Sequence, residues 1–104
     1  MVDQYSISYA PAFMNELLRD SSFIRNEYFD DVAADKIVNE IARKIAIRSC
    51  SPDSYQAKSI KTDDHTYYVI NTNHRMIFYR VKNKVMEVAF MYHSGWNGLD
   101  ATRF

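Results

Sequence analysis

The 104-residue chain is poor in the residues that mark several protein classes. Its one cysteine, Cys50, excludes an intramolecular disulfide and fits a reducing compartment. Two glycines and two prolines are too few for long flexible linkers, and there is no glycine-rich phosphate loop. No apolar run approaches the roughly 20 residues that span a bilayer. The first residues also lack the basic and then apolar pattern of a signal peptide. We therefore expect a cytoplasmic protein without a membrane partner.

The chain also lacks a net charge, because 13 basic residues balance 13 acidic ones. The charges are unevenly spread along the chain. Residues 1–40 hold three Lys/Arg and eight Asp/Glu, whereas residues 41–104 hold ten and five. A basic C-terminal half could meet phosphates or an acidic partner. A solvated surface with uneven charge explains the same pattern equally well.

What the chain does have is a hydrophobic content of 47%, which supports one domain with a real core over residues 1–104. Alternation of apolar and polar residues predicts a strand over residues 5–10. Pro11 suits the first turn of a helix, which we expect to weaken or end at Ser21-Ser22. Asp30-Asp31 can cap a second, clearly amphipathic helix that reaches about Arg48.

The second half of the chain has the composition of strands. After a turn over residues 51–54, strands are predicted at residues 56–61, 66–71, 75–81 and 85–93. The fold class is therefore α+β. We expect an N-terminal strand, a two-helix hairpin, and then a three- to four-stranded, mostly antiparallel sheet packed on the helices.

The hairpin formed by the last two strands decides which side chains share a face. A three-residue loop over residues 82–84 pairs Tyr79 with Glu87. A two-residue loop, Asn83-Lys84, would pair Arg75 with Tyr92, and it lacks the Asn-Gly signal of such loops. With the three-residue loop, the face under the helices carries Met76, Phe78, Met86, Val88, Phe90 and Tyr92. The open face carries Arg75, Ile77, Tyr79, Glu87, Ala89, Met91 and His93, with Arg75 and His93 near each other.

The residues predicted for the open face include the parts of a metal-independent ribonuclease. Arginine binds phosphate through a planar fork, and histidine exchanges protons near neutral pH. Tyrosine can stack or assist proton transfer, and glutamate can act as a base. Solvent-facing or capping roles for Arg75 and His93 are the simpler alternative. The histidines are far apart in the sequence and there is no second cysteine, so we expect no metal site and no cofactor.

The segment "YYVINTNHRMIFYRVKNKVMEVAFMYHS" resembles the C-terminal half of the RelE/ParE superfamily of bacterial toxins. Its "HR" strand and its strand ending in "YH" are most similar to the YoeB branch. The upstream strand and the helix containing "AADKIVNEIARKI" also suit this superfamily. The resemblance implies a toxin of a type II toxin–antitoxin pair, with a cognate antitoxin as partner. RelE and YoeB relatives cut mRNA on the ribosome, whereas ParE relatives inhibit DNA gyrase.

The resemblance also implies roles for single residues. Arg75 matches the phosphate-binding arginine and His93 the catalytic histidine, which we expect to act as general acid. Ser94 stands where the YoeB pattern ends in tyrosine, so the role of that tyrosine is lost or moves to Tyr92 or Tyr79. Glu87 is our own candidate for the base, and Lys58 and Lys61 match basic, RNA-binding strand residues. A gyrase inhibitor and a non-catalytic binding module on the same fold remain open alternatives.

Overall fold

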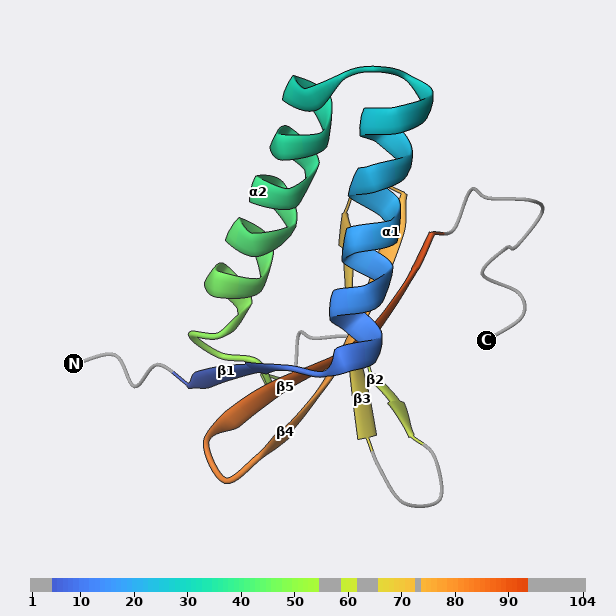
Figure 1. Cartoon of the computed structure of the whole chain (residues 1–104). Helices are drawn as coiled ribbons and strands as arrows, with labels where there is room; N and C mark the ends of the chain where they lie inside the picture. The colour runs from blue at the N-terminus through green and yellow to red at the C-terminus, as the bar shows by residue number, and fades with distance from the viewer. Residues whose placement is uncertain (1–4, 55–58, 62–65, 73, 94–104) are drawn as a thin grey trace.

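Two helices lie on one face of a five-stranded mixed sheet in the computed structural model, which describes residues 5–54, 59–61, 66–72 and 74–93 (Figure 1). The predicted α+β layout is confirmed. In chain order the elements are β1 (Ser6–Tyr9), α1 (Pro11–Glu27), α2 (Asp31–Arg48), β2 (Ser59–Lys61), β3 (Thr66–Thr72), β4 (Arg75–Lys82) and β5 (Val85–His93). The strands lie in the order β1-β5-β4-β3-β2. The edge strand β1 runs parallel to β5, and the other neighbours are antiparallel.

Both helices begin where the sequence predicts. Pro11 is the first residue of α1, and the side chain of Asp30 caps α2 by accepting a hydrogen bond from the Ala33 amide at 2.9 Å. The expected end of α1 at Ser21-Ser22 is wrong, because the helix continues to Glu27. The Ser21 hydroxyl donates to the carbonyl of Leu18 at 3.2 Å, which satisfies it inside the helix. Neither helix is long and apolar enough to cross a membrane.

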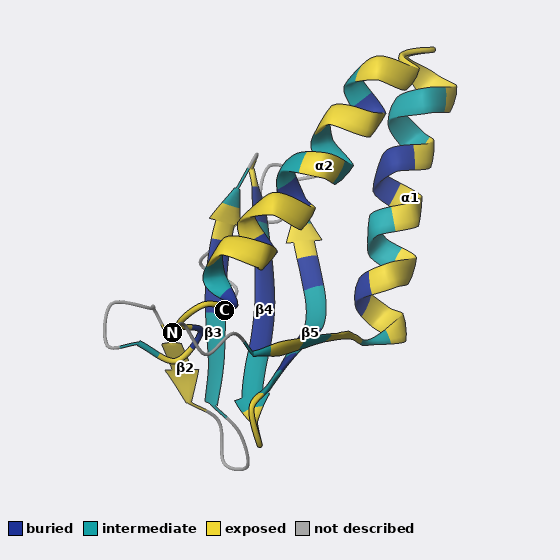
Figure 2. Cartoon of the chain, turned by 90° about the vertical axis from the view of Figure 1, so that its left-hand side faces the viewer, coloured by how far each residue is buried: buried dark blue, intermediate teal, exposed yellow. Residues whose placement is uncertain are grey.

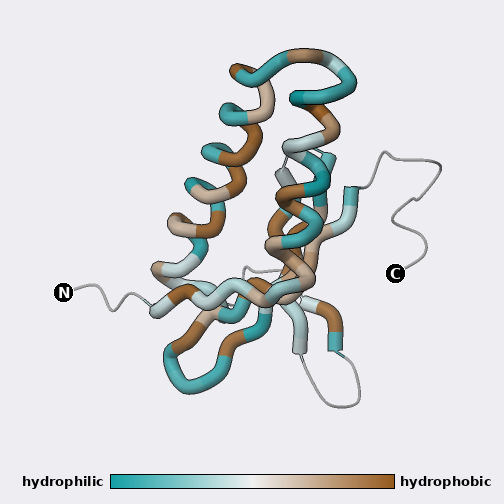
Figure 3. Tube along the Cα trace, in the orientation of Figure 1, coloured by the Kyte–Doolittle hydropathy of each residue, from teal (hydrophilic) through white to brown (hydrophobic). Residues whose placement is uncertain are grey.

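The core lies between the helices and the sheet. Each helix turns a buried side inward and an exposed side outward (Figure 2), and the same division is visible in the hydropathy of the chain (Figure 3). Burial of each large apolar side chain contributes about 1.5–3 kcal/mol. The buried cluster consists of Phe13, Ile41, Ile45, Ile70, Ile77, Tyr79, Met86, Val88 and Met91.

The β4–β5 hairpin differs from the prediction in its loop. The expected three-residue loop is wrong, because Lys82 pairs directly with Val85 and leaves a two-residue turn, Asn83-Lys84. Both turn residues have positive φ, 53° and 64°, as this tight turn requires. An irregularity between Phe78 and Tyr79 then shifts the register by one residue on β5.

This register corrects the predicted faces of the sheet. The prediction that Met76, Phe78, Phe90 and Tyr92 lie under the helices is wrong, since they lie on the face away from them, and only Met86 and Val88 of that set are in the core beneath the helices. Arg75, Ile77 and Tyr79, predicted for the open face, point toward the helices and are buried. Residues of β4 alternate between faces as predicted, but the face assigned to the core was the wrong one. The polar side chains of Arg75 and Tyr79 suggested an open face, because the sequence does not show that they find partners under the helices.

Candidate functional site

Arg75 and His93 are directly paired across β4 and β5, at the end of the sheet distant from the hairpin turn. Their predicted proximity is therefore confirmed, although the register that produces it was not the one expected. A two-residue loop alone would have paired Arg75 with Tyr92. The one-residue register shift near Phe78 moves His93 into that position instead. The site thus depends on the irregularity in the middle of the hairpin.

Arg75 is not on an open surface but forms a buried ion pair with Asp20 of α1. The guanidinium Nε donates to Asp20 Oδ2, and Nη2 donates to Asp20 Oδ1 at 2.9 Å. The two side chains are 4% and 9% exposed, so the pair is largely shielded from water. The two-point geometry fixes the plane of the guanidinium and balances its charge. Any anion that binds Arg75 must therefore compete with this carboxylate.

This ion pair forms part of the wall of a pocket of about 380 Å³ between the helices and the end of the sheet. Two histidines reach it: His93 from β5 and His74, which precedes β4 with a positive φ of 61° and is exposed. The remaining walls come mainly from the helices. The lining residues are Asp20, Phe23, Ile24, Tyr28, Ile37, His74, Arg75 and His93.

The surroundings of His93 favour its neutral form. Burial lowers the pKa of the imidazole below its ordinary value of 6.5, and the positive charge of Arg75 lowers it further. The nearby carboxylate of Asp20 acts in the opposite direction, while His74 adds a small lowering effect. At neutral pH His93 is therefore a proton acceptor beside an arginine.

Tyr79 lies in the core and outside this pocket. Its hydroxyl donates to the Pro52 carbonyl at 2.5 Å and accepts from Arg48 Nη1 at 3.0 Å, and the side chain is 0% exposed. Burial raises the pKa of the hydroxyl above 10.0, against the opposing effect of Arg48. These contacts tie β4 to the end of α2 and to the turn after it. They give Tyr79 a structural role, and the expectation that it lies on the open face is wrong.

The other predicted site residues lie away from the pocket. Glu87 is paired with Arg80 Nε at 2.5 Å, toward the hairpin turn. Tyr92 is 41% exposed on the face away from the helices, where its ring contacts Phe78 and Phe90. Lys61 is exposed on β2 at the edge of the sheet, and Lys58 and Ser94 lie outside the described residues. Of the predicted catalytic set, the structure brings together only Arg75 and His93.

Sequence reasoning missed Asp20 and His74. Asp20 could have been found, because Phe13, Leu17, Asp20 and Ile24 follow the i, i+4, i+7, i+11 spacing of one helix face. An aspartate within such an apolar stripe needs a cationic partner. No comparable signal marked His74, whose position depends on the turn before β4. Within the described ranges, no three His, Cys, Asp or Glu side chains form a group that could hold a metal ion.

The pocket offers a space large enough for a phosphate group beside an arginine and two imidazoles, which suits acid–base chemistry on a phosphodiester. Comparison of the chain with known protein families and with curated proteins found no match in either. The function must therefore be argued from the site.

Proposed function

We propose that the protein is a toxin of the RelE/ParE type that cleaves mRNA on the ribosome. The observation that carries this proposal is the pairing of Arg75 with His93, which puts an arginine and a neutral histidine in one pocket with His74. The order of strand, helix pair and sheet agrees with the layout that the sequence resemblance implies. An antitoxin encoded beside the toxin is the proposed protein partner.

In the proposed reaction His93 accepts the proton of the 2′-hydroxyl. The 2′-oxygen attacks the phosphorus, the bond to the 5′-oxygen breaks, and a 2′,3′-cyclic phosphate remains. His74, exposed at the same pocket, donates a proton to the leaving 5′-oxygen. Arg75 exchanges its ion pair with Asp20 for the phosphate and stabilises negative charge on it. The lowered pKa of His93 supports a role as base in place of the acid role suggested by the resemblance.

The test is cleavage of a defined mRNA by the full chain on translating ribosomes, with the new 5′ ends mapped. We expect His93→Gln to abolish cleavage and His74→Gln to slow it by about 100-fold or more, a typical size for loss of one acid–base group. Arg43→Gln, on the exposed outer side of α2, is the matched control and should cleave as the wild type does. Equal cleavage by the wild type and His93→Gln would remove His93 from the mechanism.

A protein-directed inhibitor, such as a gyrase poison, is the second candidate. The Asp20–Arg75 pair favours it, since an arginine whose charge is already balanced is a weaker phosphate ligand. In this case the purified chain should inhibit supercoiling by gyrase and leave ribosomal mRNA intact. His93→Gln should then inhibit as well as the wild type, which separates the two candidates.

A further inference from the structure

The connection between the two helices carries the most exposed apolar surface among the described residues. We call residues 25–35 the tip. Tyr28 is 68%, Phe29 89% and Val32 79% exposed. Figure 2 shows the connection between the helices as exposed, and Figure 3 shows hydrophobic segments set between hydrophilic ones there. Phe29 also has a φ of 51°, a conformation that costs a non-glycine residue about 1 kcal/mol or more. The fold thus holds a large apolar ring in water on a strained backbone.

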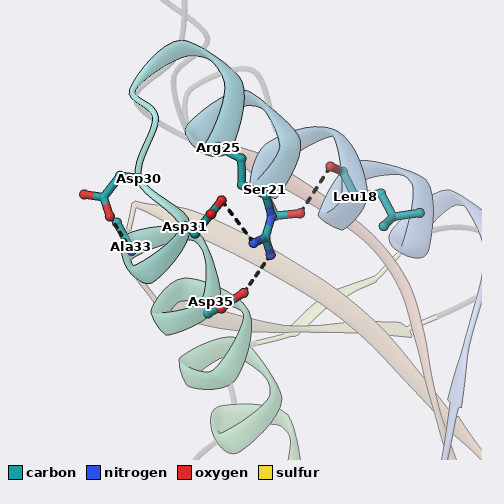
Figure 4. Close-up of polar contacts among 7 residues, drawn as sticks. All are labelled: Leu18, Ser21, Arg25, Asp30, Asp31, Ala33 and Asp35. Carbon is teal, nitrogen blue, oxygen red and sulfur yellow. Dashed lines mark hydrogen bonds and ion pairs between the residues drawn. The ribbon is translucent and has the colours of Figure 1, made fainter.

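Exposed ion pairs and a helix cap link the two helices at the tip. Arg25 of α1 reaches across to α2, with Nη2 2.7 Å from Asp35 Oδ1 and Nη1 3.6 Å from Asp31 Oδ1 (Figure 4). Asp30 caps α2 in the same view. Phe29 and Val32 are therefore presented on a braced turn. An anchor held in this way loses little conformational entropy when it binds a partner.

The charge of the tip limits the chemistry of its partner. Residues 25–35 hold four carboxylates and one arginine. Such a surface repels RNA and anionic lipid, and it fits a surface that carries apolar and basic side chains together.

A pocket with both apolar and charged walls lies at the opposite end of the same molecule. It measures about 700 Å³ and is lined by the β4–β5 hairpin and by Thr66 and Tyr68 of β3. Tyr68, Val81 and Val85 supply its apolar surface, and Arg80, Lys82 and Glu87 its charged surface. Residues 80–87 hold three basic side chains and one acidic one. We call this the hairpin pocket.

The tip and the hairpin turn lie at opposite ends of the fold (Figures 1 and 2), whose longest extent is 42 Å. Two copies placed side by side in opposite directions therefore bring each tip to the other's hairpin. This arrangement closes with two-fold symmetry, because each copy gives its tip to the same partner whose tip it receives. It also gives a role to the acidic first part of a neutral chain, which the proposed function does not explain.

We propose that the protein forms an antiparallel two-fold dimer in which the Phe29 tip of each copy occupies the hairpin pocket of the other. The contact is apolar at its centre and ionic at its rim. It is a salt-sensitive association, since exposed ion pairs are screened as ionic strength rises.

Sedimentation velocity of the full chain over a range of concentrations tests the proposal. The wild type should approach the mass of a dimer and no more, and it should dissociate in high salt. Phe29→Gly should weaken the dimer at least tenfold, as loss of a central aromatic anchor does. This variant suits its backbone conformation, so it should fold at least as stably as the wild type. Leu18→Ser, at a 60% exposed apolar position outside the tip, is the matched control and should dimerise normally.

Charge reversal tests the reciprocal contact. Glu27→Lys in the tip and Lys82→Glu at the hairpin, both exposed positions, should each weaken self-association. An equimolar mixture of the two variants should recover a dimer, because the lysine introduced in the tip of one variant then meets the glutamate introduced at the hairpin of the other. A monomer at all concentrations, a dimer unaffected by Phe29→Gly, a mass that grows beyond two copies, or a mixture that stays monomeric would each overturn the proposal.

Discussion

The buried ion pair between Asp20 and Arg75 gives the sharpest stability prediction. Asp20→Ala removes the carboxylate and leaves the guanidinium of Arg75, only 4% exposed, without its balancing charge. Breaking a buried pair in this way costs about 3–5 kcal/mol, because the remaining charge keeps its desolvation penalty. A domain of this size is stable by only about 5–15 kcal/mol. Asp20→Ala should therefore remove a large part of the folding free energy.

Replacing both partners should have a different result. In Asp20→Leu/Arg75→Met neither charge of the pair remains. The free energy of unfolding of the double variant should therefore be within about 1–2 kcal/mol of the wild-type value, or higher than it. Arg75→Met alone should also destabilise the fold, because it leaves the buried carboxylate of Asp20 without its balancing charge.

Urea unfolding of the four proteins measures these differences, with the free energy taken from the midpoint and the slope. A control is Glu16→Ala, which breaks the exposed ion pair with Arg19 at 3.3 Å and should cost under about 1 kcal/mol. If Asp20→Ala costs no more than this control, the charge left on Arg75 carries no large desolvation penalty and the prediction is wrong. If the double variant is as unstable as Asp20→Ala, its loss reflects packing and the charge argument fails.

Three further predictions concern single side chains. Tyr79→Phe should cost about 1–3 kcal/mol in urea unfolding, since the buried Pro52 carbonyl loses its donor. For His93 the unfolded chain binds a proton more tightly than the folded one, so stability should fall as pH drops through 6.5 and level off below the lowered pKa. His93→Gln should remove that dependence. Glu87→Gln should change stability by less than about 1 kcal/mol, because the side chains of its pair with Arg80 are 35% and 37% exposed.

The elements of this fold could be predicted because local signals mark them. Each signal can be recognised within a short stretch of sequence. The signals are Pro11 at the start of α1, the Asp30 cap of α2 and the β-rich runs of the second half. The end of α1 could not be read, because Ser21-Ser22 is a weak stop signal and tertiary contacts carry the helix past it. The parallel pairing of β1 with β5 joins distant segments, and no local pattern specifies it.

The site was harder to predict because one residue of register reverses every face of a strand. The positive-φ turn at Asn83-Lys84 uses lysine where glycine is the usual signal, and the shift near Phe78 has no marker in the sequence. Polar residues such as Arg75 and Tyr79 are not expected on the inner face of the sheet unless their hydrogen-bonding partners are known. Arg75 needs Asp20, which is 55 residues away in the chain, and Tyr79 needs Arg48 and Pro52.

The same ion pair can also decide between the two candidate functions. If Arg75 binds a phosphate during RNA cleavage, the phosphate competes with the carboxylate of Asp20. Asp20→Asn keeps the size of the side chain and removes the competing charge. It should then bind a short RNA oligonucleotide several-fold more tightly than the wild type does, while its folding free energy falls. Charges a few ångströms apart at partly buried sites interact by about 2–4 kcal/mol, so the gain should be measurable by fluorescence anisotropy at low salt.

The control is Asp53→Asn, which changes the net charge equally at the exposed turn after α2. A gain shared by both variants would reflect general attraction between RNA and a more positive protein. A gain confined to Asp20→Asn would support phosphate binding at Arg75. A loss of stability without any gain in RNA affinity would leave the pair a purely structural one, and the protein-directed function would become the better proposal.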